Sequence, residues 1–145
     1  MTLTSSASTV QESGSDLTLT ATLEVPTYED VTVSIDGTGG SATEGTDFAT
    51  VSDITISAGN TTGTAAFNPT DDSLYDAASD ESAVIAISGV SGGSAIESGT
   101  QSVSITIEDN ESAPTVNLTT SDTTIAENSG SSLTLTETLS GTTYQ

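Results

Sequence analysis

The side chains in this sequence that could carry out chemistry are carboxylates, and they are densest in the stretch NPTDDSLYDAASDESAVI at residues 68–85. Five acids lie within eleven consecutive positions there: Asp71, Asp72, Asp76, Asp80 and Glu81. The chain has 145 residues, with 21 aspartates and glutamates and no lysine, arginine or histidine, so its formal net charge at pH 7 is −21. No side-chain cation of the protein can therefore neutralise these acids.

Repulsion among clustered carboxylates has to be relieved from outside the chain. Two like charges about 4 Å apart repel by roughly 4 kcal/mol at an effective dielectric constant of about 20. Five or six such charges would outweigh the stability of a typical domain, which is about 5–15 kcal/mol. A hard divalent cation removes this cost at neutral pH, and oxygen ligands without cysteine or histidine favour Ca²⁺ or Mg²⁺ over Zn²⁺. Ca²⁺ is preferred because it accepts irregular sites of about six to eight oxygens.

The missing residue types exclude several classes of function. Ser-His-Asp and Cys-His systems, lysine bases and His/Cys zinc sites cannot form. A carboxylate pair could hydrolyse glycosides, but the chain has only 3% aromatic residues and no tryptophan to line a substrate cleft. The acidic charge repels nucleic acid and anionic lipid surfaces, and no apolar run approaches the length of about 20 residues that spans a bilayer. We therefore expect a non-enzymatic protein without nucleic acid or membrane insertion.

The elements that must position the acids are short segments in which apolar and small polar residues alternate. These segments are LTLTATL (17–23), VTVSI (31–35), ITI (54–56), AVIAI (83–87) and VSITI (103–107). Such a period of two, with glycine, asparagine and proline between the segments, predicts an all-β antiparallel sandwich. Loops from alternate connections collect at one end of a sandwich, so acids in several loops can converge. The alternative interpretation is a solvated acidic loop of a salt-adapted protein, which needs no shared geometry.

An internal repeat defines the expected domain organisation. LTSSASTVQESGSDLTLTATL (3–23) returns as LTTSDTTIAENSGSSLTLTETL (118–139), at an offset that grows from 115 to 116 residues near Asn128. We expect a sandwich at residues 1–111, a stiff linker around Pro114 at 112–115, and the first strands of a second repeat at 116–145. Two strands alone cannot form a stable core, so the tail either belongs to a longer array or donates strands to a neighbouring copy.

Four motifs in order resemble the Calx-beta domains, which occur in sodium/calcium exchangers and in tandem in extracellular adhesion proteins. They are the early ES at Glu12, SATEGTDF (41–48), TDDSLYDAASDE (70–81) and the closing SITIEDNE (104–111). The resemblance covers nearly all of residues 1–111.

The resemblance implies an immunoglobulin-like sandwich of seven antiparallel strands with Ca²⁺ sites at one end. It carries the metal ligands over to the matching positions, which are Glu12, Asp47, Asp71, Asp72, Asp76, Glu81, Asp109, Asn110 and Glu111. The segment AASDE is longer than the family's spacing. Either Asp80 or Glu81 can therefore be the last ligand of that loop.

The function expected from these features is a Ca²⁺-binding structural repeat of an extracellular fibre, stalk or adhesin, in contact with neighbouring repeats or copies of itself. In it, Ca²⁺ would stiffen the loop end and the junction to the next repeat. Two alternatives stay open: a filament subunit whose C-terminal strands complete an adjacent copy, and a module that binds cell-surface glycans.

Overall fold

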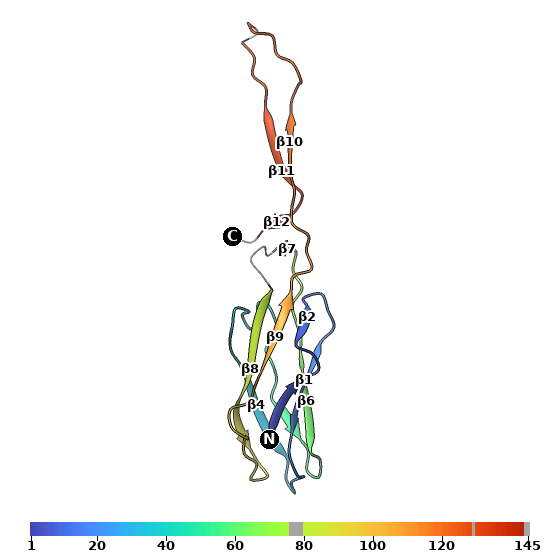
Figure 1. Cartoon of the computed structure of the whole chain (residues 1–145), viewed down its shortest axis with the longest axis vertical. Coiled ribbons are helices and arrows are strands. Elements are labelled where there is room, and N and C mark those ends of the chain that lie inside the picture. The colour runs from blue at the N-terminus through green and yellow to red at the C-terminus, as the bar shows by residue number, and fades with distance from the viewer. Residues whose placement is uncertain (76–79, 129, 144–145) are drawn as a thin grey trace. The chain divides into compact units, whose positions relative to one another are not determined.

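The alternating segments form strands, and no helix occurs among residues 1–75, 80–128 and 130–143, which the computed structural model describes (Figure 1). The expected all-β fold is thereby confirmed. No helix in these ranges is long and apolar enough to cross a membrane. The chain divides into two units, described separately below. The N-terminal unit comprises Met1–Asp72 and Ser79–Asn110, and the C-terminal unit comprises Ser73–Ala78 and Glu111–Gln145.

One sheet of the N-terminal unit has three strands in the order β1-β3-β6, all antiparallel. The strands are β1 (Thr2–Ser5), β3 (Leu17–Thr22) and β6 (Thr62–Phe67). Along β3 the leucines and Ala21 are buried while the threonines between them are half-buried or exposed. This alternation places one face of the sheet in the core, as the period of two predicts.

The second sheet has five strands in the order β2-β9-β8-β4-β5. The strands are β2 (Thr9–Gln11), β9 (Ser102–Glu108), β8 (Glu81–Ser91), β4 (Val31–Gly40) and β5 (Ile54–Ile56). The pair β2 and β9 is parallel, and the other pairs are antiparallel.

The chain start is divided between the two sheets, because β1 pairs with β3 whereas β2 pairs with β9. Among its described residues, the N-terminal unit therefore has eight strand segments in two sheets. The expected sandwich is present, but the expected count of seven strands is not confirmed.

The core between the sheets is made of aliphatic side chains and one aromatic pair. Leu19, Ile54 and Ile105 are fully buried. The rings of Phe48 and Phe67 stack with their centroids 4.9 Å apart. No polar or charged side chain is buried among the described residues, so the acids lie at the surface or at its edge.

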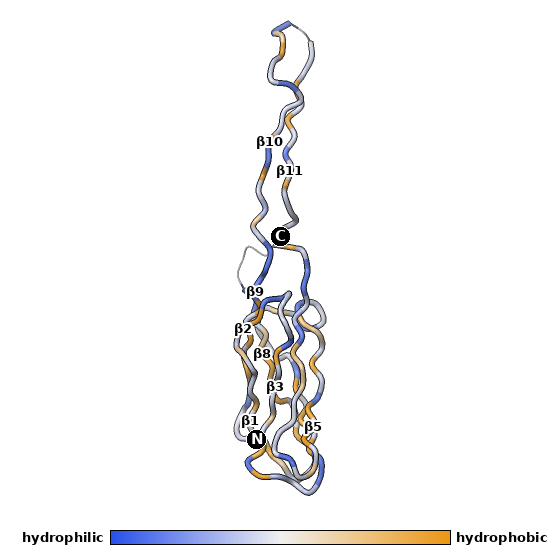
Figure 2. Tube along the Cα trace, turned by 90° about the vertical axis from the view of Figure 1, so that its right-hand side faces the viewer, coloured by the Kyte–Doolittle hydropathy of each residue, from blue (hydrophilic) through white to orange (hydrophobic). Residues whose placement is uncertain are grey.

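The C-terminal unit contains two strand pairs. An antiparallel pair joins β10 (Val116–Thr120) to β11 (Leu135–Leu139), and a parallel pair joins β7 (Leu74–Tyr75) to β12 (Thr142–Thr143). We call residues 116–139 the tail hairpin and residues 1–23 the N-terminal hairpin. Hydrophobic residues recur along β10 and β11 in Figure 2. The predicted boundaries at 111 and 116 stay a prediction.

Candidate metal centre

Three strands of the larger sheet bring acidic residues to the same end of the N-terminal unit. Ile107 on β9 lies beside Val10 of the parallel strand β2 and beside Glu81 of the antiparallel strand β8. The residues that follow β2 and β9, and the first residue of β8, therefore share one sheet end. In Figure 1 the N-terminus lies at the opposite end of the sandwich.

Glu12 and Asp71 are two acids of this unit whose carboxylates approach each other. Glu12 follows β2, and its amide donates to the carbonyl oxygen of Glu108, 3.0 Å away, which holds it against the end of β9. One carboxylate oxygen of Glu12 lies within 4.8 Å of one of Asp71. Glu12 is half-buried, whereas Asp71 is exposed. These segments are far apart in sequence and meet only through the fold.

The loop that carries Asp47 is anchored next to the acidic segment. The amide of Thr70 donates to the carbonyl oxygen of Asp47 over 3.0 Å, directly before Asp71 in the chain. Phe48 forms a bridge to Pro69, and its stacking on Phe67 fixes the loop to the end of β6.

Asp47 also has a local structural contact. Its Oδ2 accepts a hydrogen bond from the amide of Thr43 over 2.6 Å, and its amide donates back to the carbonyl oxygen of Thr43 over 2.9 Å. One carboxylate oxygen therefore stabilises the turn, so a metal-ligating role of Asp47 stays a prediction.

The residues after β9 contact the segment after β2. The amide of Asn110 donates to Oε1 of Glu12 over 3.4 Å, and Oδ1 of Asn110 accepts from the amide of Ser13 over 3.3 Å. Asp109 is half-buried between Glu108 and Asn110. Glu12 and Asn110 thus tie the two strand ends together independently of any metal.

The burial of the other predicted ligands differs from one to the next. Asp72 is exposed beside Asp71, Glu81 is half-buried at the start of β8, and Asp80 is exposed. Asp76 lies outside the described residues. Glu111 is the first residue of the second segment of the C-terminal unit and is half-buried. Nothing in these positions decides between Asp80 and Glu81, and the set of nine ligands stays a prediction.

Acids outside the predicted set also have structural functions, and Glu44 is an example. Oε1 of Glu44 accepts from the amide of Val51 over 3.1 Å, which closes the loop around Phe48. Its position three residues before Asp47 in SATEGTDF is the only sequence signal that could have indicated this function.

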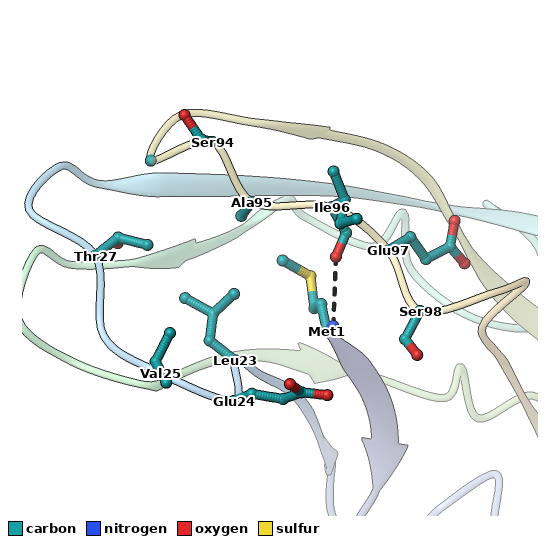
Figure 3. A pocket seen from close by; sticks show the side chains of 11 residues that line it. Met1, Leu23, Glu24, Val25, Thr27, Ser94, Ala95, Ile96, Glu97 and Ser98 are labelled. Carbon is teal, nitrogen blue, oxygen red and sulfur yellow. Dashed lines mark hydrogen bonds between the residues drawn. The ribbon is translucent and has the colours of Figure 1, made fainter.

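The opposite end of the sandwich has a different character. An open pocket of about 320 Å³ is lined there by apolar side chains, including Met1, Leu23 and Ile96, and by polar ones, including Glu24 and Glu97 (Figure 3). The carboxylate of Glu97 at its edge accepts from the amide of Gln101. This end of the unit thus combines apolar and acidic side chains.

The acidic end has the donor chemistry and spacing for Ca²⁺. Ca²⁺–oxygen bonds of about 2.3–2.6 Å allow two ligand oxygens to lie up to roughly 5 Å apart. The separation of at most 4.8 Å between oxygens of Glu12 and Asp71 fits this limit. Because the ligands are oxygens alone, the site suits a hard cation.

Comparison by sequence finds no match, since neither a family model nor a curated protein is significantly similar to the chain. Comparison of structures does find similar folds. The calcium binding domain CBD12 of CALX1.1 matches 82% of this chain with a TM-score of 0.62 and 18% identity. The chain has the Calx-beta fold. CBD12 from CALX1.2 matches 98% of it with a TM-score of 0.59 and 14% identity.

These Calx-beta matches confirm the predicted resemblance at the level of the fold. The chain spans 50% of the length of the CALX1.1 structure and 70% of that from CALX1.2. At such identities the similarity establishes the immunoglobulin-like sandwich and does not identify the metal ligands.

Proposed function

We propose that the N-terminal unit binds Ca²⁺ at its acidic end and acts as a non-catalytic structural repeat of an extracellular fibre, stalk or adhesin. The observation that carries this proposal is the pair Glu12 and Asp71, whose carboxylate oxygens lie within 4.8 Å of each other in a chain without any side-chain cation. The fold shared with the calcium binding domain of CALX1.1 supports it.

Ca²⁺ at this end would act by linking segments that are distant in sequence. Glu12 and Asp71 would hold the ion from the two sheets, and Asp72, Asp109 and Asp47 lie in the adjoining loops. Binding to the native state alone stabilises it by about 2.7 kcal/mol when the free Ca²⁺ concentration is about 100 times Kd. Extracellular modules work with Kd values of about 10⁻⁴ to 10⁻³ M, which suits an extracellular setting.

The test is a Ca²⁺ titration of thermal unfolding in wild type and in Asp71→Asn. We expect millimolar Ca²⁺ to raise the Tm of wild type above its value in EDTA, and Asp71→Asn to reduce this increase by at least half. Asp36→Asn is the matched control, because Asp36 is exposed on β4 and its loss removes the same charge. An equal Tm in Ca²⁺ and EDTA for wild type would refute the proposal.

We further propose that the tail hairpin begins a second repeat of the same kind. In the repeat, Leu118 corresponds to Leu3 and Glu137 corresponds to Ala21. Leu3 pairs with Ala21 in the N-terminal hairpin, and Leu118 pairs with Glu137 in the tail hairpin. The amide of Thr18 donates to Oγ of Ser6 over 2.9 Å, and the amide of Thr134 donates to Oγ of Ser121 over 3.0 Å. Head-to-tail neighbours are then the expected partners.

The glycan-binding alternative lacks a supporting observation. Tyr28 is the only aromatic residue among the exposed large hydrophobic residues of the described ranges. A single ring is not the aromatic platform on which sugars stack. The filament alternative depends on whether the tail hairpin can enter the sandwich of another copy.

A further inference from the structure

The N-terminal hairpin and the tail hairpin have equivalent sequences. The N-terminal hairpin belongs to a three-stranded sheet of the sandwich, whereas β10 and β11 of the tail hairpin form a two-stranded sheet. All four pairs of the N-terminal hairpin, from Thr2 with Thr22 to Ser5 with Leu19, recur in the tail hairpin at the positions equivalent by the repeat. Oγ1 of Thr4 donates to the carbonyl oxygen of Thr20 over 3.4 Å, and Oγ1 of Thr119 donates to that of Thr136 over 3.4 Å. The paired strands of the two hairpins therefore have the same register.

The apolar face of the hairpin is buried in one instance and exposed in the other. Leu3 and Leu19 are buried against the core, while their equivalents Leu118 and Leu135 are 58% and 67% exposed. Val116, Ile125, Leu133 and Leu139 are likewise exposed. The tail hairpin thus presents the same apolar side chains that the sandwich accepts from the N-terminal hairpin.

Replacement of one hairpin by the other would join two copies of the chain. Among the residues that the structure describes, β11 pairs only with β10. Its other edge is equivalent to the edge by which β3 pairs with β6, from Leu17 with Phe67 to Thr22 with Thr62. If the tail hairpin of one copy took this place in a second copy, the contact would be head to tail. Such a head-to-tail contact gives a closed ring or an open fibre, depending on the rotation between successive copies.

One position opposes this exchange. Ala21 is fully buried, between Leu3 on β1 and Gly63 on β6, and its equivalent in the tail hairpin is Glu137. Glu137 would bring a larger side chain and a negative charge into that core, and the chain has no side-chain cation to pair with it. An unpaired buried charge is strongly destabilising, and inward-pointing charged residues are a known means of preventing association of strands.

We propose that Glu137 is the specificity-determining residue that keeps the tail hairpin out of the sandwich of a second copy. This inference rests on the proposed assignment of the tail hairpin as the start of a second repeat, whose own core must then differ from that of the N-terminal unit at the positions facing Glu137, but not on Ca²⁺ binding. It also argues against the filament alternative, because wild-type copies would not complete one another.

The test compares wild type with Glu137→Ala, which restores the residue that the N-terminal hairpin has at this position. Both proteins carry Thr62→Cys and Thr138→Cys. Thr22 pairs with Thr62 in the sandwich, so exchange would place Thr138 of one copy opposite Thr62 of another. The amide of Leu23 bonds to the carbonyl of Thr61, so Thr22 and Thr62 form the closer, non-hydrogen-bonded type of pair, which suits a disulfide. The chain has no other cysteine, so a disulfide between position 62 of one copy and position 138 of another, identified by mass spectrometry of the linked peptides, reports exchange, whereas 62–62 and 138–138 disulfides do not.

After unfolding and slow refolding, in Ca²⁺ and separately in EDTA, we expect Glu137→Ala to yield at least about tenfold more disulfide-linked oligomer than wild type. Glu127→Ala, which removes the same charge from the tail at an exposed position, should behave as wild type. Equal crosslinking in Glu137→Ala and wild type would overturn the proposal. Oligomers of Glu137→Ala that lack the disulfide between positions 62 and 138 would overturn it as well.

A second pair of variants tests the same position inside the folded sandwich. Ala21→Glu should lower the Tm of the N-terminal unit strongly or unfold it, whereas Thr18→Glu, on the exposed side of the same strand, should not. If Ala21→Glu is as stable as Thr18→Glu, the core accepts a carboxylate there and Glu137 excludes nothing. A loss of Ca²⁺ binding in Asp71→Asn would leave all these outcomes unchanged, so the two proposals fail separately.

Discussion

At the scale of single residues, the carboxylates of the N-terminal unit divide between maintaining turns and meeting one another. Oε1 of Glu44 and Oδ2 of Asp47 accept hydrogen bonds from amides of their own loop. Glu12 contacts the end of β9 and approaches Asp71. The two roles are not exclusive, because a carboxylate has lone pairs for both an amide and a cation.

Asp47 allows its two roles to be separated. Asp47→Asn keeps an oxygen for the Thr43 amide but removes the charge, so the Tm in EDTA should stay near that of wild type while the Ca²⁺-induced increase falls. Asp47→Ala removes the acceptor as well and should cost about 1 kcal/mol in EDTA, or roughly 3–6 °C in Tm. An unchanged Ca²⁺ response in Asp47→Asn would show that this carboxylate serves the turn only.

At the scale of elements, the sandwich depends on a close approach between strands of the two sheets. A side chain at Gly63 on β6 would place its Cβ 2.4 Å from the carbonyl oxygen of Thr55 and 2.9 Å from Cγ2 of Ile54 on β5. Real Cβ atoms do not come so close to a backbone oxygen. Glycine at this position therefore lets β6 lie directly against β5.

Gly63→Ala should destabilise the N-terminal unit by about 1–3 kcal/mol, because one of the two strands must shift. Gly39→Ala is the matched control, since a Cβ there meets no atom within 4 Å and its φ is not positive. Chemical denaturation of the two variants measures the difference. Equal midpoints for Gly63→Ala and Gly39→Ala would contradict the close approach.

At the scale of the whole molecule, the dominant property is a charge of −21 without any side-chain cation. Repulsion between exposed charges is screened by salt, with a Debye length of about 10 Å at 0.1 M ionic strength. Salt alone should therefore stabilise the protein in EDTA. Binding at a defined site would add to this general effect.

A comparison at matched ionic strength separates screening from binding. We expect about 2 mM CaCl₂ to raise the Tm clearly more than NaCl of the same ionic strength, because only a bound ion gains the mass-action term. The same increase for both salts would mean that Ca²⁺ acts only by screening.

Much of the fold could be predicted from local pattern. Alternation in segments such as Leu17–Thr22 and Val103–Ile107 indicated strands with one buried face, and the repeat indicated the tail hairpin. The division of the chain start between two sheets was not predictable, because the short segments Thr2–Ser5 and Thr9–Gln11 carry no information about their distant partners. Strand order depends on tertiary packing.

The sequence by itself determined that any positive partner of the acids must come from outside, since composition alone excludes an internal one. Only the tertiary structure decided which acids meet: Glu12 approaches Asp71, while an oxygen of Asp47 is occupied by its own turn. It also showed that Ala21, the residue equivalent to Glu137, is fully buried, which cannot be seen in the sequence. The physical reason is that charge is a sum over residues, whereas a site depends on which chain segments the packed sheets bring together.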